Sequence, residues 1–506
     1  MSSRITNSLK NYFSGIASKL VSMIMSFVVR TFFIITLSSE YLGVNGLFSN
    51  ILTILSLAEL GFGTAILYSL YEPLAQDNQE KISSILNLFK KIYNVIGIAV
   101  LVVGLCLLPF LSYLIGETKI DDIKVIYILY LINTAVSYFS GAYKKTLLIA
   151  DQKQYIINLY SNVFLLIKSI GQIIVLLLFK DFVVYLVSQI ILTILENLFF
   201  SVYVSKKYIY LKEKSNKGIE RGDKIKIFND VKALFFTKVG HVMLNGTDNM
   251  IVSRFVGLNQ VGLLSNYVLI VDSVSIMISQ IINSCAASIG NFLVTNTNED
   301  NYEMFKNIDF INFWINAYVS ICVYFLINDF VKLWLGEGYV FENNIVLVIS
   351  LNFFINGMIN FFWIFRTTLG LFLQGKYRSI ITGLINIIIS LILAKKYGIF
   401  GVLLGTTISR ISVSLWYDPY IVLKFGFNKK VFDYLRKYVF RFLVLTITIY
   451  LCFIIKEHFI CTNILEFIAC GIVLTLMTNF VFSVMFLNTA EFKYILALSK
   501  RIILKK

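Results

Sequence analysis

Charged side chains stand inside long apolar segments of this sequence. Arg30, Glu59, Lys238 and Asp272 stand in four different segments and are the hardest to explain as interfacial groups, whereas Lys19 could extend its ammonium group to the membrane interface. A charge at the centre of a bilayer costs at least about 2.5–3.5 kcal/mol on insertion scales, and it usually faces a hydrated cavity. We therefore expect these side chains to line a polar interior.

Two polar stripes in the two halves of the chain correspond at one offset. The first stripe consists of Lys19, Ser22, Ser26 and Arg30, and the second, 219 residues later, of Lys238, His241, Asn245 and the adjacent Asp248 and Asn249. Steps of three and four residues place side chains on one helix face. The same offset pairs Gly43 with Gly262, which indicates an internal repeat.

Polar residues, most of them asparagines, form similar stripes further along the chain. They are Asp309, Asn312 and Asn316 on one segment, and Asn352, Asn356 and Asn360 on the next, ending near Arg366. Each asparagine alone could simply bond a neighbouring helix, for about 0.6–2 kcal/mol. Stripes in both halves favour a shared polar interior.

The chemistry of these groups suggests a phosphorylated, glycosylated substrate. Arginine presents a planar fork to phosphate oxygens, and asparagine and serine suit sugar hydroxyls. An acid beside a cation could take up H⁺ or Na⁺ and couple transport to a gradient. The predicted substrate-binding residues are Arg30, Lys19, Lys238, Arg366 and Asn356, and the predicted charge-balancing or coupling residues are Glu59, Asp248, Asp272 and His241.

The elements that position these residues are membrane-spanning helices. Of the 506 residues, 58% are hydrophobic and 15% charged, against about 25% charged in soluble proteins. The apolar runs approach the 20 or so residues that a helix needs to cross a bilayer, and they lack the alternation of a membrane barrel. We predict an all-α polytopic membrane protein of about fourteen helices, at residues 12–37, 42–70, 86–114, 124–149, 155–179, 182–205, 232–256, 260–293, 305–335, 345–372, 378–396, 399–424, 438–456 and 463–487.

The basic residues predict orientation and domain boundaries. Lys and Arg concentrate in alternate loops, which places both termini in the cytoplasm. The high content of Ile, Asn and Lys with only three prolines points to a bacterial host, so we expect the bacterial cytoplasmic membrane. The predicted parts are an N-terminal lobe (residues 1–209), a cytoplasmic linker (210–230), a C-terminal lobe (231–425), and two extra helices with a tail (426–506).

Several function classes lack their signals. The sequence has no Gly-x-x-x-x-Gly-Lys-Ser/Thr phosphate loop, only two histidines, and six cysteines without metal-ligand spacing. The net charge of +16 lies at segment ends and not on one basic face, which argues against nucleic acid. A long external loop bearing acids, expected of a polymerase or glycosyltransferase, is also missing. We therefore expect no enzyme and no cofactor beyond a coupling ion.

Short segments in both halves resemble the polysaccharide repeat-unit flippases (Wzx type) of the MATE-like exporter superfamily. They are YLGVNGLFSN at residues 41–50, LAELGFG at 57–63, YEPLA at 71–75, TDNMIVS at 247–253, VGLLSNY at 261–267, FRTTLGLF at 365–372, GKYR at 375–378 and WYDP at 416–419. The resemblance implies two six-helix lobes in a V shape plus two C-terminal helices. It also implies cavity cations on the first helix of each lobe, where Lys19, Arg30 and Lys238 stand. Asp248 departs from this pattern of cations, because it places an acid beside the residue that corresponds to Arg30.

The resemblance implies alternating access that carries undecaprenyl-pyrophosphate-linked oligosaccharides to the outer leaflet, for capsule, O-antigen or a similar polymer. Membrane lipids, a polymerase and chain-length proteins of the same pathway would be its partners. Two alternatives stay open: a cation-coupled exporter of small amphiphiles with the same fold, and a membrane polysaccharide polymerase.

Overall fold

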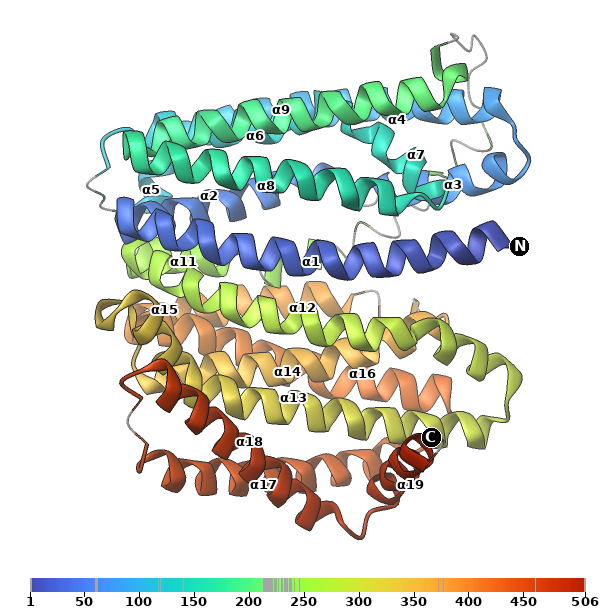
Figure 1. The fold of residues 1–506 in the computed structure, drawn as a ribbon, viewed down its shortest axis with the longest axis vertical. Helices are drawn as coiled ribbons and strands as arrows, with labels where there is room; N and C mark the ends of the chain where they lie inside the picture. The colour runs from blue at the N-terminus through green and yellow to red at the C-terminus, as the bar shows by residue number, and fades with distance from the viewer. Residues whose placement is uncertain are drawn as a thin grey trace. The chain divides into compact units, whose positions relative to one another are not determined.

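The computed structural model is helical in all the regular secondary structure that it describes (Figure 1). It describes residues 2–504 except 60–61, 117, 119, 140, 213–221, 223–224, 226, 229–230, 232–234, 236–238, 241, 245, 372, 376 and 460. The predicted site residues Lys238 and His241 lie outside the described residues, as does most of the predicted linker.

Ten helical segments of the described chain are long and apolar enough to cross a membrane, which confirms the prediction of an all-α polytopic membrane protein. They are built on α1 (Ser2–Thr36), α4 (Gln79–Leu107), α8 (Gln154–Phe179), α9 (Phe182–Lys207), α12 (Leu258–Thr295), α13 (Asn298–Leu335), α14 (Asn343–Thr368), α15 (Arg378–Ser409), α17 (Val431–Lys456) and α18 (Ile464–Phe486). A short α5 (Leu111–Ile115) continues α4, and α19 (Ala490–Leu504) follows α18.

The other expected spans are interrupted or joined helices. Residues 42–70 form α2 (Ser39–Leu55), a 3₁₀ turn (Ser56–Glu59) and α3 (Phe62–Ala75), and residues 124–149 form α6 (Ile123–Phe139), a 3₁₀ turn and α7 (Lys145–Ala150). The expected span 232–256 is described only in part, with α11 (Asp248–Phe255) at its end.

The expected spans 378–396 and 399–424 are joined without a loop. They meet at Gly398, whose backbone (φ 57°, ψ −134°) turns the chain inside α15. Glycine alone adopts this conformation readily because it lacks a Cβ. The second span then continues through a π-helical turn (Arg410–Ser414), α16 (Leu415–Ile421) and a second π-helical turn (Val422–Gly426).

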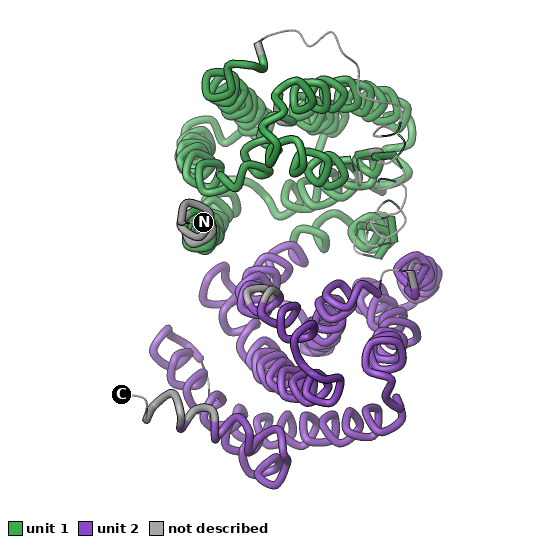
Figure 2. The backbone as a smooth tube through the Cα atoms, turned by 90° about the vertical axis from the view of Figure 1, so that its right-hand side faces the viewer, with its two compact units in different colours: residues 1–262 green, residues 263–506 purple. Residues whose placement is uncertain are grey.

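The chain divides into two compact units, residues 1–262 and 263–506, each a bundle of helices (Figure 2). In the first unit α1 packs along α8, and the core forms around aromatic rings such as Phe48 and Tyr127. The predicted domain boundaries at residues 209, 230 and 425 stay predictions.

Two glycines let α2 contact the start of α12 within the first unit. A Cβ on Gly43 would lie 1.9 Å from the carbonyl oxygen of Leu258, and a Cβ on Gly262 would lie 2.0 Å from that of Ser39. Small residues allow such close approach of two helix backbones. These are the two glycines 219 residues apart, so corresponding positions of the sequence repeat pack against each other.

In the second unit, α17, α18 and α19 pack against α13 (Figure 1). Arg441 on α17 forms a buried ion pair with Asp309 on α13, and Tyr434 donates a hydrogen bond of 3.1 Å to the same carboxylate. Lys456 pairs with Asp329 at 2.7 Å further along the same two helices. The C-terminal helices are therefore anchored to the second unit by charge as well as by apolar packing.

Candidate functional site

The predicted stripe on α1 lies close to polar residues of the same helix that bond α8. Ser18 donates to Asn162 of α8 at 2.8 Å, and Ser14 accepts from Asn158 at 3.0 Å. Lys19, by contrast, is exposed. Ser22 and Ser26 are exposed as well, and Arg30 is half-buried. The interface with α8 therefore uses small polar residues, and most of the predicted stripe is exposed.

Arg30 lies at the inner part of this stripe among aromatic side chains. Tyr185 and Tyr130 lie near it, and Tyr130 donates a hydrogen bond to Asn45 on α2. A planar guanidinium fork can bond two oxygens of a phosphate group at once. The placement is compatible with the predicted phosphate contact, which stays a prediction.

Glu59 ends the 3₁₀ turn that interrupts the second expected span. Its two carboxylate oxygens accept hydrogen bonds from Tyr93 at 2.6 Å and from Tyr138 at 2.8 Å. No ion pair to this carboxylate occurs among the residues that the structure describes. Two phenol donors hold Glu59 at a break in the helix; its predicted coupling role stays a prediction.

The second predicted stripe is described only at its end. Asp248 is the first residue of α11, where a negative charge is favoured by the helix dipole. The neighbouring Asn249, which corresponds to Arg30 in the repeat, donates to the carbonyl oxygen of Gly46 at 3.4 Å. Asn249 therefore contributes to the packing of α11 against α2.

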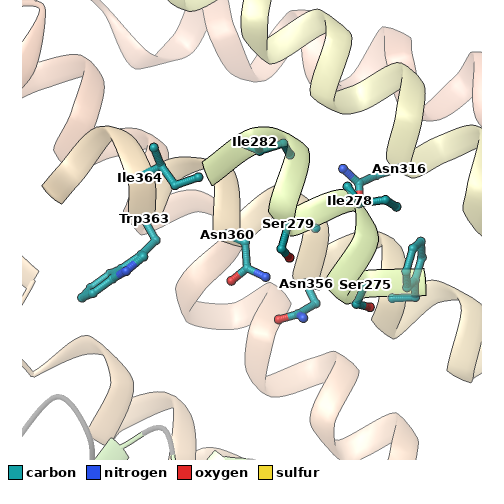
Figure 3. Close-up of a pocket in the computed structure, with 11 residues that line it drawn as sticks. Ser275, Ile278, Ser279, Ile282, Asn316, Asn356, Asn360, Trp363 and Ile364 are labelled. Atoms are coloured by element: carbon teal, nitrogen blue, oxygen red, sulfur yellow. The ribbon is translucent and has the colours of Figure 1, made fainter. Parts of the chain in front are cut away.

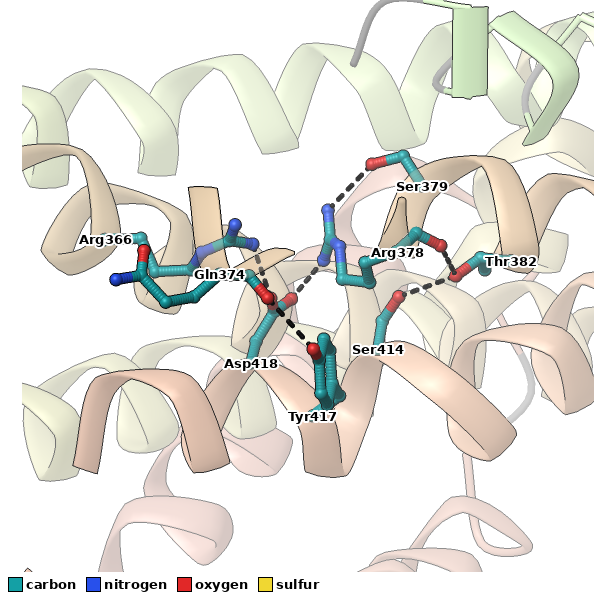
Figure 4. Close-up of polar contacts among 8 residues, drawn as sticks. All are labelled: Arg366, Gln374, Arg378, Ser379, Thr382, Ser414, Tyr417 and Asp418. Atoms are coloured by element: carbon teal, nitrogen blue, oxygen red, sulfur yellow. Dashed lines mark hydrogen bonds and ion pairs between the residues drawn. The ribbon is translucent and has the colours of Figure 1, made fainter. Parts of the chain in front are cut away.

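Arg366 is part of a buried ion-pair cluster in the second unit (Figure 4). Its Nη1 donates to Asp418 Oδ1 at 2.8 Å, and Arg378 bonds the other carboxylate oxygen. A Cβ on Gly375 would lie 2.2 Å from Arg366 Nη2, so the loop after α14 closes tightly over the guanidinium group. The cluster joins α14, α15 and α16. This gives Arg366 a structural role, and its predicted contact with substrate stays a prediction.

Asn356 lines a cavity of about 280 Å³ between α12, α13 and α14 (Figure 3). Asn360, Ser275 and Ser279 contribute polar groups to the same cavity, and Trp363 lies at one end of the row. The predicted coupling residue Asp272 is exposed on α12, one turn before Ser275. The helical spacing of residues 272, 275 and 279 was a signal that sequence reasoning missed.

Comparison with known proteins identifies the class. The family described as polysaccharide biosynthesis protein matches residues 8–289, more than half of the chain, and the chain belongs to this family. No curated protein sequence matches the chain.

Solved structures of transport proteins share the fold of this chain. The lipid II flippase MurJ in an inward closed conformation aligns with a TM-score of 0.62 and 16% identity, over 95% of this chain and 99% of that one. An inward-facing multidrug resistance MATE family transporter of the MOP superfamily aligns with a TM-score of 0.58 and 12% identity, over 81% and 98%. A single-residue mutant of the Vibrio cholerae MATE transporter VcmN aligns with a TM-score of 0.57 and 13% identity, over 86% of this chain and 100% of that one.

Proposed function

We propose that this protein moves polyprenyl-pyrophosphate-linked oligosaccharide repeat units from the cytoplasmic to the outer leaflet of a bacterial cytoplasmic membrane by alternating access. The observation that carries the proposal is membership of the polysaccharide biosynthesis family. A fold shared with a lipid II flippase over 95% of the chain is consistent with it. Both termini would lie in the cytoplasm, as the distribution of basic residues favours.

In this proposal the first unit binds the pyrophosphate. Arg30 and Lys19 stand on one face of α1, and Lys238 would add a third cation from the corresponding segment. Glu59, Asp248, Asp272 and His241 would balance these charges or bind the H⁺ or Na⁺ that drives transport. The oligosaccharide crosses without covalent chemistry, and the polyprenyl tail stays in the lipid.

Deletion of the gene in its own host tests the proposal directly. We expect the lipid-linked repeat unit to accumulate in the cytoplasmic leaflet, where an added membrane-impermeant glycosidase or lectin cannot reach it in intact cells. Accumulation in the outer leaflet would instead mean that the chain acts after translocation, as a polymerase does. Unchanged surface polysaccharide, together with new sensitivity to small amphiphiles, would favour the exporter.

Arg30 provides a sharper test of the phosphate contact. Replacing Arg30 with Ala should reduce export of the repeat unit by at least about tenfold, because a charge-assisted bidentate contact is lost. Replacing it with Lys should retain part of the export, since the charge remains but the fork geometry does not. Surface polysaccharide is measured at matched protein levels. Normal export by Arg30→Ala would show that Arg30 does not bind the substrate.

A further inference from the structure

Four polar side chains of the cavity in the second unit have no hydrogen-bond partner in the described part of the chain. They are the amides of Asn356 and Asn360 on α14 and the hydroxyls of Ser275 and Ser279 on α12. Figure 3 shows them gathered in one row between the two helices. Polar groups at membrane depth are costly unless they bond water or a ligand. The row therefore presents a set of donors and acceptors to whatever enters the cavity.

The cavity is uncharged. All eleven residues that line it are neutral. The nearby Arg366, two residues beyond Ile364 in the lining, is buried and shares the carboxylate of Asp418 with Arg378. An anionic group in this cavity would lose hydration and would meet no cationic side chain in the lining, which is a penalty.

One wall is aromatic and partly exposed. Trp363 is 39% exposed, and Phe353 forms part of the lining. Small-molecule sites combine apolar or aromatic walls with a few well-placed polar groups. At about 280 Å³ the cavity is at the small end of the range for such sites, about 300–1,000 Å³. It suits one sugar ring and not a whole repeat unit.

The cavity floor is fixed by a buried amide. Asn316 of α13 is 1% exposed, and its side chain donates to the backbone and side-chain oxygens of Asn312 at 2.8 and 3.0 Å. Gly357 makes room for it, since a Cβ there would lie 1.9 Å from Asn316 Oδ1. The open amides of Asn356 and Asn360 thus stand over a rigid support.

We propose that this cavity binds one uncharged sugar residue of the transported oligosaccharide and selects against acidic sugars at that position. Asn356, Asn360, Ser275 and Ser279 would bond its hydroxyl or acetamido groups, and Trp363 would contact its apolar face. The inference rests on the proposed function and adds that each unit binds a different part of the substrate. The first unit binds the pyrophosphate, and the second unit recognises a neutral sugar.

The test measures binding of three lipid probes to the purified full-length chain in nanodiscs. The probes are undecaprenyl pyrophosphate alone, the same lipid carrying N-acetylglucosamine, and the same lipid carrying glucuronic acid. We expect the neutral sugar to tighten binding about tenfold over the sugar-free lipid, and the acidic sugar to give no gain. Asn360→Ala and Trp363→Ala should each remove that tenfold gain and leave binding of the sugar-free lipid unchanged.

Asn352→Ala is the matched control. Asn352 lies on the same helix, but its amide donates to the carbonyl oxygen of Leu403 at 2.9 Å instead of lining the cavity. This variant should keep the tenfold gain, and size-exclusion profiles and thermal midpoints check that every variant is folded.

The outcomes separate the two proposals. If the wild-type chain binds the sugar-free lipid but gains nothing from the neutral sugar, or gains as much from the acidic one, the cavity proposal is overturned alone. If folded Asn360→Ala and Trp363→Ala both keep the gain, the same conclusion follows. If the wild-type chain binds none of the three lipids, the proposed function fails as well.

Discussion

The polar stripes of α13 and α14 look alike in sequence and differ in structure. Asp309, Asn312 and Asn316 on α13 are each 1% exposed, and their side chains bond protein groups. Asn356 and Asn360 on α14 face a cavity and bond no described residue. A polar stripe in a membrane helix can therefore stabilise the fold or present a binding surface. The difference lies in whether the neighbouring helices satisfy it.

The α13 stripe should matter most for stability, and Asp309 gives the largest expected effect. Asp309→Ala leaves the buried guanidinium group of Arg441 without its carboxylate, which we expect to lower the free energy of unfolding by about 3–5 kcal/mol. Thermal or denaturant unfolding in detergent measures this loss of stability. The double variant Asp309→Leu with Arg441→Met should recover much of the loss, because no unpaired charge stays buried.

An exposed ion pair formed by another residue of α13 is the control for that experiment. Glu299 pairs with Lys429 but is 77% exposed, so Glu299→Ala should change stability by less than about 1 kcal/mol. If Asp309→Ala were as mild as Glu299→Ala, the α13 stripe would not have the structural role that its burial indicates.

Gly357 couples the two stripes and gives the next largest effect. Gly357→Ala would place a Cβ 1.9 Å from Asn316 Oδ1, so the Asn316 amide must move off its bonds to Asn312. Overpacking of this kind costs about 1–3 kcal/mol. The unfolding measurement above tests it.

Gly471 on α18 serves as the control for Gly357. A Cβ at Gly471 would meet only Leu326 Cδ1, at 3.7 Å, which is ordinary contact. Gly471→Ala should therefore be neutral, or stabilising by up to about 1 kcal/mol through helix propensity. Equal effects at the two glycines would mean that Asn316 adjusts without strain, and the support of the cavity would be less rigid than its contacts indicate.

Hydrophobicity predicted the fold class because a membrane helix must be long and apolar over its whole length. It did not predict where helices break. The residues around Glu59 read as one continuous span, yet the chain forms α2, a 3₁₀ turn and α3 there. The expected boundary between residues 378–396 and 399–424 does coincide with the turn at Gly398, but hydropathy did not predict that the two spans join there without a loop.

Helical spacing predicted which residues share a face but not which neighbour each one meets. Asn352, Asn356 and Asn360 recur at every fourth residue, and each step turns the side chain by about 40° around the helix. Asn352 consequently points to Leu403, while the other two reach the cavity. Arg366 likewise looked like a free intramembrane cation because Asp418, its partner, lies 52 residues away. Such distant pairings depend on packing that spacing alone does not specify.

The smallest expected change in stability concerns the two amides at the ends of the α14 stripe. Asn352→Leu removes one of the side-chain donors to the carbonyl oxygen of Leu403, which Thr407 Oγ1 still reaches at 3.1 Å, and should cost about 1 kcal/mol, the net value of one hydrogen bond. Asn360→Leu leaves no protein group unsatisfied, because no described residue bonds this amide, and leucine has a similar volume. Its free energy of unfolding should stay within about 1 kcal/mol of the wild-type value.

These two variants separate a binding surface from a structural contact on one helix. Unfolding in detergent without lipid substrate gives stability, and the neutral-sugar lipid gives binding. Asn360→Leu should be stable and lose the sugar-dependent gain, whereas Asn352→Leu should be less stable and keep it. If Asn360→Leu proved the less stable of the two, its amide would have a partner in the folded chain. The contrast between α13 and α14 would then be one of degree, because both stripes would stabilise the fold.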